Sequence, residues 1–293
     1  DRCGGGKRHR GGCAMSYTLR AFLAYLRAGM AVMLQYRGEI VLWAIWGLVN
    51  PAVLYAMWSA AAESNAGGAV AGFAREDIAA YFFIIVIVGH LTAAWDAYEM
   101  GYFVRTGKLS PLLLRPILPI WQALAGNLSY KLATLVFVVP MWGVFAWVVK
   151  PTFHTEAWQL ALGALALVLA GVLNFLLGYV VSLIAFWVVK LDAAGEVYFG
   201  LSMFLGGRFA MLEVLPQPIR SIAELLPFRW MYAFPTQLLT GRGYNPAGGG
   251  RADIGVSEAW AGIGVQLVWI VGAIVVFRVL WTAAVKRYTA VSG

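Results

Sequence analysis

The sequence has 293 residues, of which 61% are hydrophobic and only 12% are charged. Soluble domains carry about 25% charged residues, so this chain has too few to keep a globular surface hydrated, and we expect an integral membrane protein. The formal net charge is +8, but the basic residues flank apolar runs, so we interpret it as a membrane-orientation signal rather than a nucleic-acid site.

The amino-terminal segment, residues 1–14, is rich in glycine and precedes any apolar run. Cys3 and Cys13 do not have the spacing of a zinc motif, and the GGGK sequence lacks the spacing of a phosphate-binding loop. We expect residues 1–14 to be a disordered or artificially attached tail, with Met15 as the natural start.

The next segment, residues 17–38, is apolar but is interrupted by Arg20, Arg27 and Arg37. Three arginines argue against a bilayer-spanning helix. They suit an amphipathic helix that lies in the membrane interface with its arginines toward the lipid headgroups. We predict such a helix over 17–38. Its lipid-facing side is expected to comprise Phe22, Leu26, Met30 and Met33.

Six apolar runs follow, each a candidate spanning helix because a bilayer core requires about 20 apolar residues. They lie at about 39–61, 78–97, 127–149, 158–189, 195–214 and 259–285. The fourth run is longer than a bilayer requires, and the fifth is interrupted by the sequence GGR at 206–208. The predicted fold is an all-α integral membrane protein, with the interfacial helix and six transmembrane helices in one domain over 15–293.

The distribution of lysine and arginine predicts the orientation. When the six spans are taken in order, basic residues are more numerous on the side of the two termini than on the opposite side. Cytoplasmic segments of membrane proteins carry this excess. We therefore expect both termini, and the segment between the second and third spans, to be cytoplasmic.

That segment, RTGKLSPLLLRPILPIW at 105–121, is apolar yet contains three basic residues and three prolines. The prolines prevent one continuous helix through it, and the charges keep it at the membrane face. Its leucines require cover, either from lipid or from the groove of a partner protein. The alternative is that the basic residues only fix topology and bind anionic lipid.

A second proline-rich segment, 215–239, precedes the sixth span. It is half apolar and contains Pro216, Pro218, Pro227 and Pro235. Such a segment is too broken to span a membrane. We predict short, broken helices that dip into the outer leaflet and pack on the protein.

Polar residues inside predicted spans are candidate functional residues by default. Asn50 and Pro51 lie in the first span, His90 in the second and Asn174 in the fourth. Each also has a structural interpretation, because asparagine can hydrogen-bond neighbouring helices, proline can bend its helix and histidine can be a packed side chain. The candidate path for a translocated molecule comprises Trp46, Asn50, Pro51, His90 and Asn174.

Two sets of charged residues lie near the span ends. Asp96 and Glu99 are one turn apart, a spacing that can support acid–base chemistry. No nucleophile, metal-ligand set or cofactor motif accompanies them, so we interpret them as partners of Arg105 or of another protein. Arg208 and Glu213 are expected to pair with each other.

Catalytic signatures are missing from the sequence. It contains no hydrolytic triad, H-E-x-x-H helix, C-x-x-C pair or Walker motif. We therefore predict no catalytic and no metal-binding residues, and favour a transport function over an enzyme.

Four blocks of the sequence resemble permeases of the ABC-2 type, in particular a subgroup once filed as a domain of unknown function and labelled viologen-exporter-like. The blocks are YRGEIVLWAIWGLVNPAVLYAMW at 36–58, GKLSPLLLRPILPIWQALAGNLSYK at 107–131, ELLPFRWMYAFPTQLLTGR at 224–242 and RVLWTAAVKRYTAVSG at 278–293. The resemblance covers residues 17–293. None of the blocks specifies a substrate.

The resemblance implies an assembly in the bacterial plasma membrane. Two permeases, identical or homologous, pair and are driven by a separate ATP-binding subunit that acts as a dimer. ATP and magnesium belong to that partner, so no cofactor is expected on this chain; membrane lipids are further partners and nucleic acid is not. The loop that contacts the ATPase is expected to comprise Arg105, Gly107, Lys108, Leu109, Ser110, Pro111, Leu112, Leu113, Arg115 and Pro116.

The expected function is export of a hydrophobic or amphipathic substrate, either drug-like, cationic or lipid. Aromatic rings on the first two spans suit a cationic amphiphile, or they contact lipid: Trp43, Trp46, Tyr55, Trp58, Phe82 and Phe83. Two alternatives remain. A membrane-embedded lipid-modifying enzyme requires a cluster of acidic or histidine residues at one membrane face, and a channel or scaffold works without ATP.

Overall fold

The computed structural model describes residues 9–94, 96–188, 192–243 and 253–288, and in these ranges helices, joined by turns and loops, make up the regular structure apart from one small hairpin. The elements in chain order are α1 (His9–Gln35), α2 (Arg37–Ser64), β1 (Ala69–Val70), β2 (Phe73–Ala74), α3 (Arg75–Thr92), α4 (Asp96–Arg105), α5 (Ser110–Leu113), α6 (Pro119–Val149), α7 (Ala157–Ser182), η1 (Leu183–Phe186), α8 (Asp192–Leu205), η2 (Leu212–Val214), α9 (Gln217–Leu225), α10 (Pro227–Met231), α11 (Ala233–Thr240) and α12 (Val256–Arg287).

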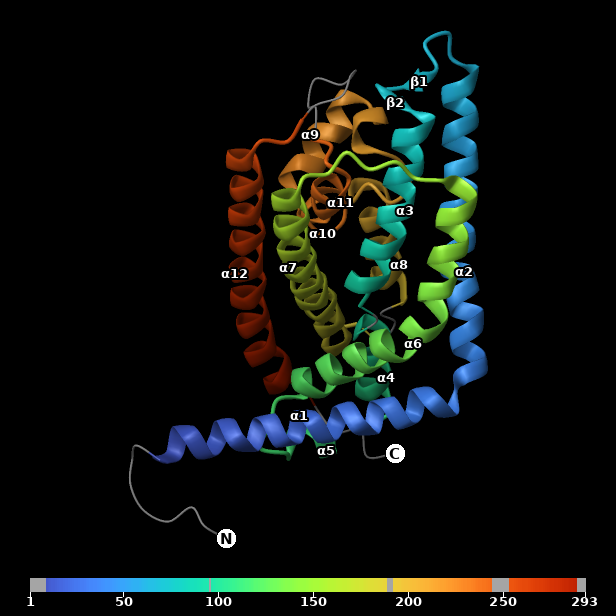
Figure 1. Ribbon diagram of the computed structural model, residues 1–293. Coiled ribbons are helices and arrows are strands. Elements are labelled where there is room, and N and C mark those ends of the chain that lie inside the picture. The colour runs from blue at the N-terminus through green and yellow to red at the C-terminus, as the bar shows by residue number, and fades with distance from the viewer. Residues whose placement is uncertain (1–8, 95, 189–191, 244–252, 289–293) are drawn as a thin grey trace.

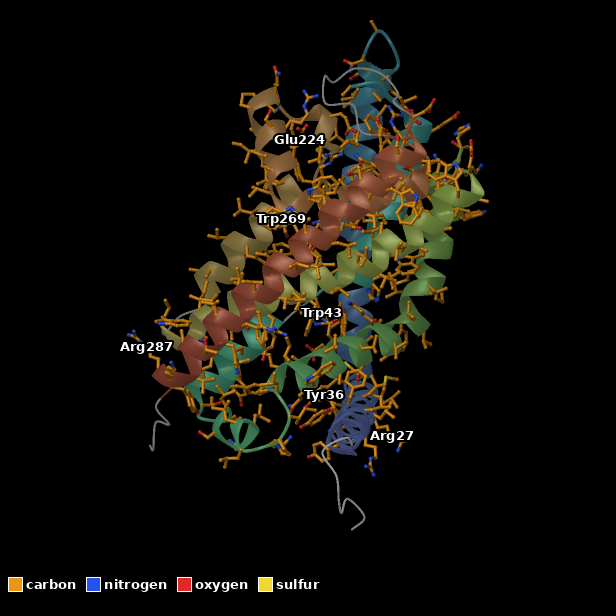
Figure 2. The ribbon with its side chains drawn as sticks, turned by 90° about the vertical axis from the view of Figure 1, so that its left-hand side faces the viewer. Arg27, Tyr36, Trp43, Glu224, Trp269 and Arg287 are labelled. Carbon is orange, nitrogen blue, oxygen red and sulfur yellow. The ribbon has the colours of Figure 1, made fainter. Side chains whose placement is uncertain are left out.

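The long helices run between two ends of the molecule (Figure 1). At one, the α1 end, α1 lies crosswise beneath the bundle together with α4, α5 and the carboxyl end of α12. The opposite, or hairpin, end carries β1, β2 and α9. Arg27 and Arg287 lie toward the α1 end, and Glu224 lies at the hairpin end (Figure 2).

Four helical segments are long and apolar enough to cross a membrane: Gly38–Ser64, Pro119–Val149, Ala157–Phe186 and Val256–Arg287. Predicted spans 39–61, 127–149, 158–189 and 259–285 fall largely on these segments. Their outward faces carry large apolar side chains, including Val136, Trp147 and Val268, which are 72%, 78% and 71% exposed. Apolar surface on this scale is stable only in contact with lipid, so the chain is a multi-pass membrane protein.

Helix α1 differs from the predicted interfacial helix at both ends. It begins at His9 and ends at Gln35, whereas the predicted helix covers 17–38; residues 1–8 lie outside the described part. Its apolar side packs on α6 rather than facing lipid, because the Phe22 and Trp121 rings meet edge to face with centroids 6.4 Å apart.

A glycine permits this close packing of α1 on α6. A Cβ atom at Gly29 would lie 2.5 Å from the Ser129 Oγ. The Ser129 hydroxyl lies within hydrogen-bond distance of the Leu26 carbonyl oxygen, at 3.0 Å, and of the Ala125 carbonyl oxygen, at 2.7 Å. The backbone of α1 at Gly29 therefore lies directly against the Ser129 side chain of α6, and no lipid lies between the two helices at this point.

Helix α3 ends at Thr92, five residues before the predicted end at 97. The sequence AAW that follows contains no helix breaker. Instead, the side-chain amide of Asn174 donates to the Thr92 carbonyl at 2.8 Å, and that of Asn127 donates to the Ala93 carbonyl at 3.0 Å. These amides satisfy the terminal carbonyls of α3, so the break is stabilised by tertiary contacts from α7 and α6.

Helix α8 ends at Leu205, whereas the predicted fifth span continued to 214. The chain turns at Gly206 and Gly207, and Gly207 has φ +83°, a backbone region that favours glycine. The Tyr81 hydroxyl on α3 donates to the Gly207 carbonyl at 2.7 Å. The turn is thereby anchored to the core, and the 3-10 helix η2 follows it.

The predicted short helices before the last span are present as α9, α10 and α11. Arg242, which follows α11, links this region to the hairpin. Its guanidinium lies 2.7 Å from the Asp77 carboxylate, donates to the Gly72 carbonyl at 2.6 Å and covers the Phe73 ring at 3.6 Å from the centroid. The largest apolar core lies below this link, where α3 and α7 meet α10; Phe82, Leu173 and Met231 are fully buried there.

Candidate functional site

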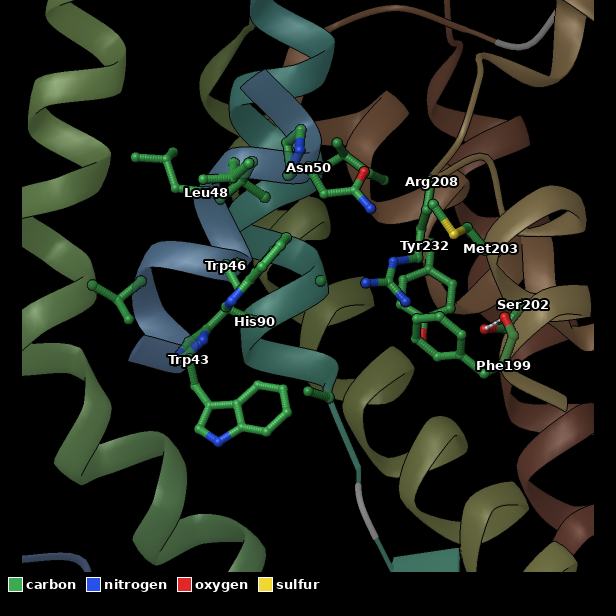
Figure 3. Close-up of a pocket in the computed structure, with 18 of the residues that line it drawn as sticks. Trp43, Trp46, Leu48, Asn50, His90, Phe199, Ser202, Met203, Arg208 and Tyr232 are labelled. Atoms are coloured by element: carbon green, nitrogen blue, oxygen red, sulfur yellow. Dashed lines mark hydrogen bonds between the residues drawn. The ribbon is translucent and has the colours of Figure 1, made fainter. Parts of the chain in front are cut away.

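A cavity of about 710 Å³ lies among α2, α3, α6, α7 and α8, and the segment that follows α8 also lines it (Figure 3). Its walls are mainly apolar and aromatic. The structure brings all five residues of the predicted path to this one cavity: Trp46, Asn50, Pro51, His90 and Asn174.

The α2 wall is irregular because Pro51 lies inside the helix. Proline has no N–H group, so the carbonyl of Gly47, four residues earlier, lacks its helical hydrogen bond. Gly47 also lines the cavity. The Asn50 side chain is exposed and makes no hydrogen bond to a described residue, and it points toward the side where Arg208 lies (Figure 3). Asn50 therefore has free donors and an acceptor in the cavity.

His90 joins α3 to α6. Its Nε2 lies 3.0 Å from the Thr134 hydroxyl, which itself donates to the Tyr130 carbonyl at 2.7 Å. The contact therefore holds the imidazole against α6 in either neutral tautomer. The Trp142 ring contacts His90 edge to face at 5.6 Å. These contacts match the structural interpretation of His90 as a packed side chain.

Asn174 is the most extensively hydrogen-bonded of the five path residues and is 3% exposed. Its amide nitrogen donates to the Thr92 carbonyl and to the Tyr232 hydroxyl, both at 2.8 Å. Its side-chain oxygen accepts a hydrogen bond from Tyr198 at 2.9 Å. Asn174 thus lines the cavity and also holds three elements together.

Arg208 is a cavity residue that the sequence-based path omitted. Its guanidinium lies 5.1 Å from the ring centroid of Tyr232 and 5.5 Å from that of Phe199. The expected pairing with Glu213 is wrong, since the structure contains no ion pair between them. Burial raises the pKa of the Glu213 carboxyl, and its basic neighbours Arg242, Arg229 and Arg220 oppose that rise. The signal that could have identified Arg208 is a charge inside an apolar run.

The six aromatic rings that suit either a cationic amphiphile or lipid do not all reach the cavity. Trp43 and Trp46 line the cavity. Phe82 is fully buried in the core, and the Trp58 indole donates to the Phe209 carbonyl at 3.1 Å. The last two rings are structural.

The loop predicted to contact a partner lies at the α1 end and contains the single helical turn α5 (Figure 1). Leu109 is fully buried and Leu112 is 8% exposed. They pack in a cluster whose other buried members are Met100, Phe175, Tyr179, Leu183 and Phe277. The expectation that these two leucines fill a partner's groove is therefore wrong, because they fill the core of their own chain. Leu114, at 87% exposed, is the outward-facing leucine.

The basic residues of the loop lie on its surface. Arg115 donates to the Tyr25 hydroxyl at 3.0 Å, which ties the loop to α1. Lys108 contacts Tyr102 through both its hydroxyl and its ring. Ser110 shares a 2.9 Å hydrogen bond with Tyr288, the residue that follows α12. The loop is thus held to α1, α4 and α12, with its cations exposed.

Of the predicted acidic pair, the structure shows the side chain of Glu99. Glu99 forms no ion pair with Arg105, and the Asp96 side chain is outside the described part. Within the ranges that the structure describes, no group of three or more His, Cys, Asp or Glu side chains could hold a metal ion.

Comparison with known proteins gives one match. Residues 48–292 match the model of a family described as ABC-2 family transporter protein. No curated protein and no solved structure matches the chain.

Proposed function

The chain belongs to the ABC-2 family of transporter proteins, and we propose that it is the transmembrane permease subunit of an ATP-driven exporter for a hydrophobic or amphipathic substrate. The observation that carries the proposal is the cavity of about 710 Å³ between the helices. Its volume falls in the range that accommodates a drug-sized ligand, and its walls combine apolar surface with a few polar groups. The family match supports transport as its use.

Energy enters from a separate ATP-binding subunit that acts as a dimer and binds ATP and magnesium. The loop between α4 and α6 is its docking surface. The support for this assignment is the exposure of Arg105, Lys108, Arg115 and Leu114 at the α1 end. Exposed cations suit acidic residues on a partner, and one exposed leucine supplies an apolar contact.

Movement of the loop reaches the cavity through α7. Leu109 and Leu112 belong to the same buried cluster as Phe175 of α7, and the residue that precedes Phe175 is Asn174 in the cavity wall. When ATP binding displaces the loop, this packed cluster shifts α7, and the hydrogen bonds of Asn174 carry the change to α3 and α8. Closely packed elements transmit such displacements as rigid units.

A second permease, identical or homologous, completes the path. In the single chain the α2 wall of the cavity is open, since Trp43 and Trp46 are 50% and 67% exposed. A partner permease on this face would enclose the cavity between two subunits.

The chain crosses the bacterial plasma membrane six times in this proposal: α2, α6, α7 with η1 and α12 are full-length spans, and the shorter helices α3 and α8 complete two further crossings together with the residues that flank them. The α1 end faces the cytoplasm, with α1 in the membrane interface and both termini on that side. Support comes from the basic residues of the loop and from the exposed residues Arg27 and Arg287, which lie toward the same end (Figure 2), with the exposed Lys286 next to Arg287 in the last turn of α12. Helices α9, α10 and α11 then lie toward the outer face.

The test is co-expression with the ATP-binding subunit encoded nearest to this chain, purification in mild detergent and reconstitution in liposomes. We expect the two proteins to co-purify and ATP to drive movement of a fluorescent amphiphile. A partner with its Walker lysine replaced by alanine should bind but not transport. Failure to recover an ATP-binding subunit would overturn the proposal, and transport without ATP would favour a channel instead.

A further inference from the structure

The cavity has a positive charge that nothing in its lining neutralises. Of the described residues that line it, Arg208 alone has a permanently charged side chain, and none is Asp or Glu. A fixed cation in a mainly apolar cavity is costly unless an anion or a polar group compensates it. The lining therefore complements a negatively charged ligand.

The position of Arg208 is fixed by the residues on both sides of it. The Gly207 carbonyl accepts a hydrogen bond from Tyr81 at 2.7 Å, and the Phe209 carbonyl accepts one from Trp58 at 3.1 Å. The side chain extends from this anchored turn into the space between α2 and α8 (Figure 3). Arg208 is thus presented by a rigid backbone rather than by a mobile loop.

The contacts of the guanidinium leave its N–H edge available. The guanidinium carbon lies over the rings of Tyr232 and Phe199, 5.1 and 5.5 Å from their centroids. No hydrogen bond or ion pair joins its nitrogens to a described residue. Five N–H donors in a planar fork match the two oxygens of a carboxylate or phosphate. The side chain of Asn50 points to the same side and offers another donor.

The remaining walls suit an apolar body. Trp43, Val86, Val138, Met141 and Trp142 line the cavity on the α2, α3 and α6 side. We infer that the cavity binds an amphiphile with a single anionic group, a carboxylate or a phosphate, which Arg208 holds while the apolar part lies against these walls. This inference rests on the proposed function and narrows its substrate class, because a cationic amphiphile would meet the guanidinium with no carboxylate to offset the repulsion.

The experiment compares two probes that differ only in charge: dansyl-aminoundecanoic acid and its methyl ester. The full chain, in nanodiscs of phosphatidylcholine, is titrated with each probe, and binding is followed by energy transfer from the cavity tryptophans to dansyl. We expect the wild-type chain to bind the acid about tenfold or more tightly than the ester, since charge-assisted bidentate hydrogen bonds are strong.

Variants assign that preference to Arg208. We expect Arg208→Gln to bind acid and ester equally and Arg208→Lys to keep part of the preference. Arg75→Gln removes an exposed arginine at the start of α3, outside the cavity, and should keep the full preference. Equal binding of both probes by the wild-type chain, or full preference in Arg208→Gln, would overturn the inference. If Arg208→Gln does not fold, Arg208→Lys provides the test. A full preference of Arg208→Lys for the acid over the ester would overturn the bidentate contact.

Competitors separate the amphiphile from its isolated headgroup. Dodecyl phosphate should displace the acid probe, whereas inorganic phosphate and dodecyltrimethylammonium should not. Inorganic phosphate that competes equally well would overturn the amphiphile assignment. Binding requires no ATPase, so a chain that binds the acid selectively yet shows no ATP-driven transport would refute the proposed function and leave this inference standing.

Discussion

The side-chain amide of Asn174 on α7 donates a hydrogen bond to the hydroxyl oxygen of Tyr232 across 2.8 Å. The same side chain bonds Thr92 at the end of α3 and Tyr198 on α8. One residue therefore joins three structural elements around the cavity. Loss of the Asn174 side chain should weaken the contacts of α7 with all three elements.

Asn174→Leu removes these three hydrogen bonds. Each interhelical hydrogen bond in a membrane protein contributes about 0.6 kcal/mol on average, so we expect a loss of about 2 kcal/mol in unfolding free energy. Asn127→Leu is the matched control, because it removes a single bond to the Ala93 carbonyl and should cost less than about 1 kcal/mol. Denaturant unfolding in detergent measures both. Equal losses would contradict the role given to Asn174.

Arg115→Glu should uncouple the ATPase from transport. The change reverses an exposed charge of the proposed docking loop and removes the 3.0 Å hydrogen bond to Tyr25. We expect normal amounts of protein in the membrane but no substrate-stimulated ATPase activity. Arg27→Glu is the control, since it makes the same charge change on an exposed residue of α1 (Figure 2). Normal stimulation in Arg115→Glu would remove the loop from the coupling mechanism.

Truncation of Leu109 should lower stability, whereas truncation of Leu114 should weaken binding of the ATP-binding subunit. Leu109 is fully buried and Leu114 is 87% exposed. Leu109→Ala leaves a cavity and should lower the unfolding free energy by about 2–5 kcal/mol. Leu114→Ala should change it by less than about 0.5 kcal/mol but reduce co-purification of the ATP-binding subunit. Thermal unfolding and pull-down yields distinguish the two, and a stable Leu109→Ala variant would refute the internal packing of the loop.

Gly29→Ala should separate α1 from α6. The added Cβ would lie 2.5 Å from the Ser129 Oγ and 2.9 Å from its Cβ. We expect a loss of about 1–3 kcal/mol from overpacking, with recovery in the double variant Gly29→Ala, Ser129→Gly. Gly38→Ala is the control, because a Cβ there meets nothing within 4 Å. If both alanine variants melt at the same temperature, the tight contact does not contribute to stability.

The sequence-based predictions succeeded where local pattern determines structure. The Gly206–Gly207 pair signalled the interruption of the fifth span, although not where its helix ends. The end of α3 was unpredictable from its own sequence, because the amides that satisfy its last carbonyls belong to Asn127 and Asn174 in later helices.

Burial in the loop depends on distant partners in the same way. Leu109 and Leu112 resembled a docking surface because nothing near them in sequence could cover them. Their cover includes Phe175 and Phe277, which are far along the chain. Arg208 was assigned to Glu213 by proximity in sequence, whereas the anchored turn directs it into the cavity. Tertiary contacts, rather than periodicity, decided each of these outcomes.

Helices α1 and α2 meet at Tyr36 alone, with no linker between them. Hydrogen bonds continue through the junction, from the Tyr36 N–H to Val32 and from the Ile40 N–H to Tyr36, both at 3.2 Å. Helix α1 is fastened to α6 by packing and to the loop by the hydrogen bond between Arg115 and Tyr25, so the direction of α2 follows that of α1. At about 1.5 Å per residue, Asn50 lies about 20 Å along α2 from the junction at Tyr36. A tilt of α2 by about 5° at this junction therefore displaces Asn50 by about 2 Å.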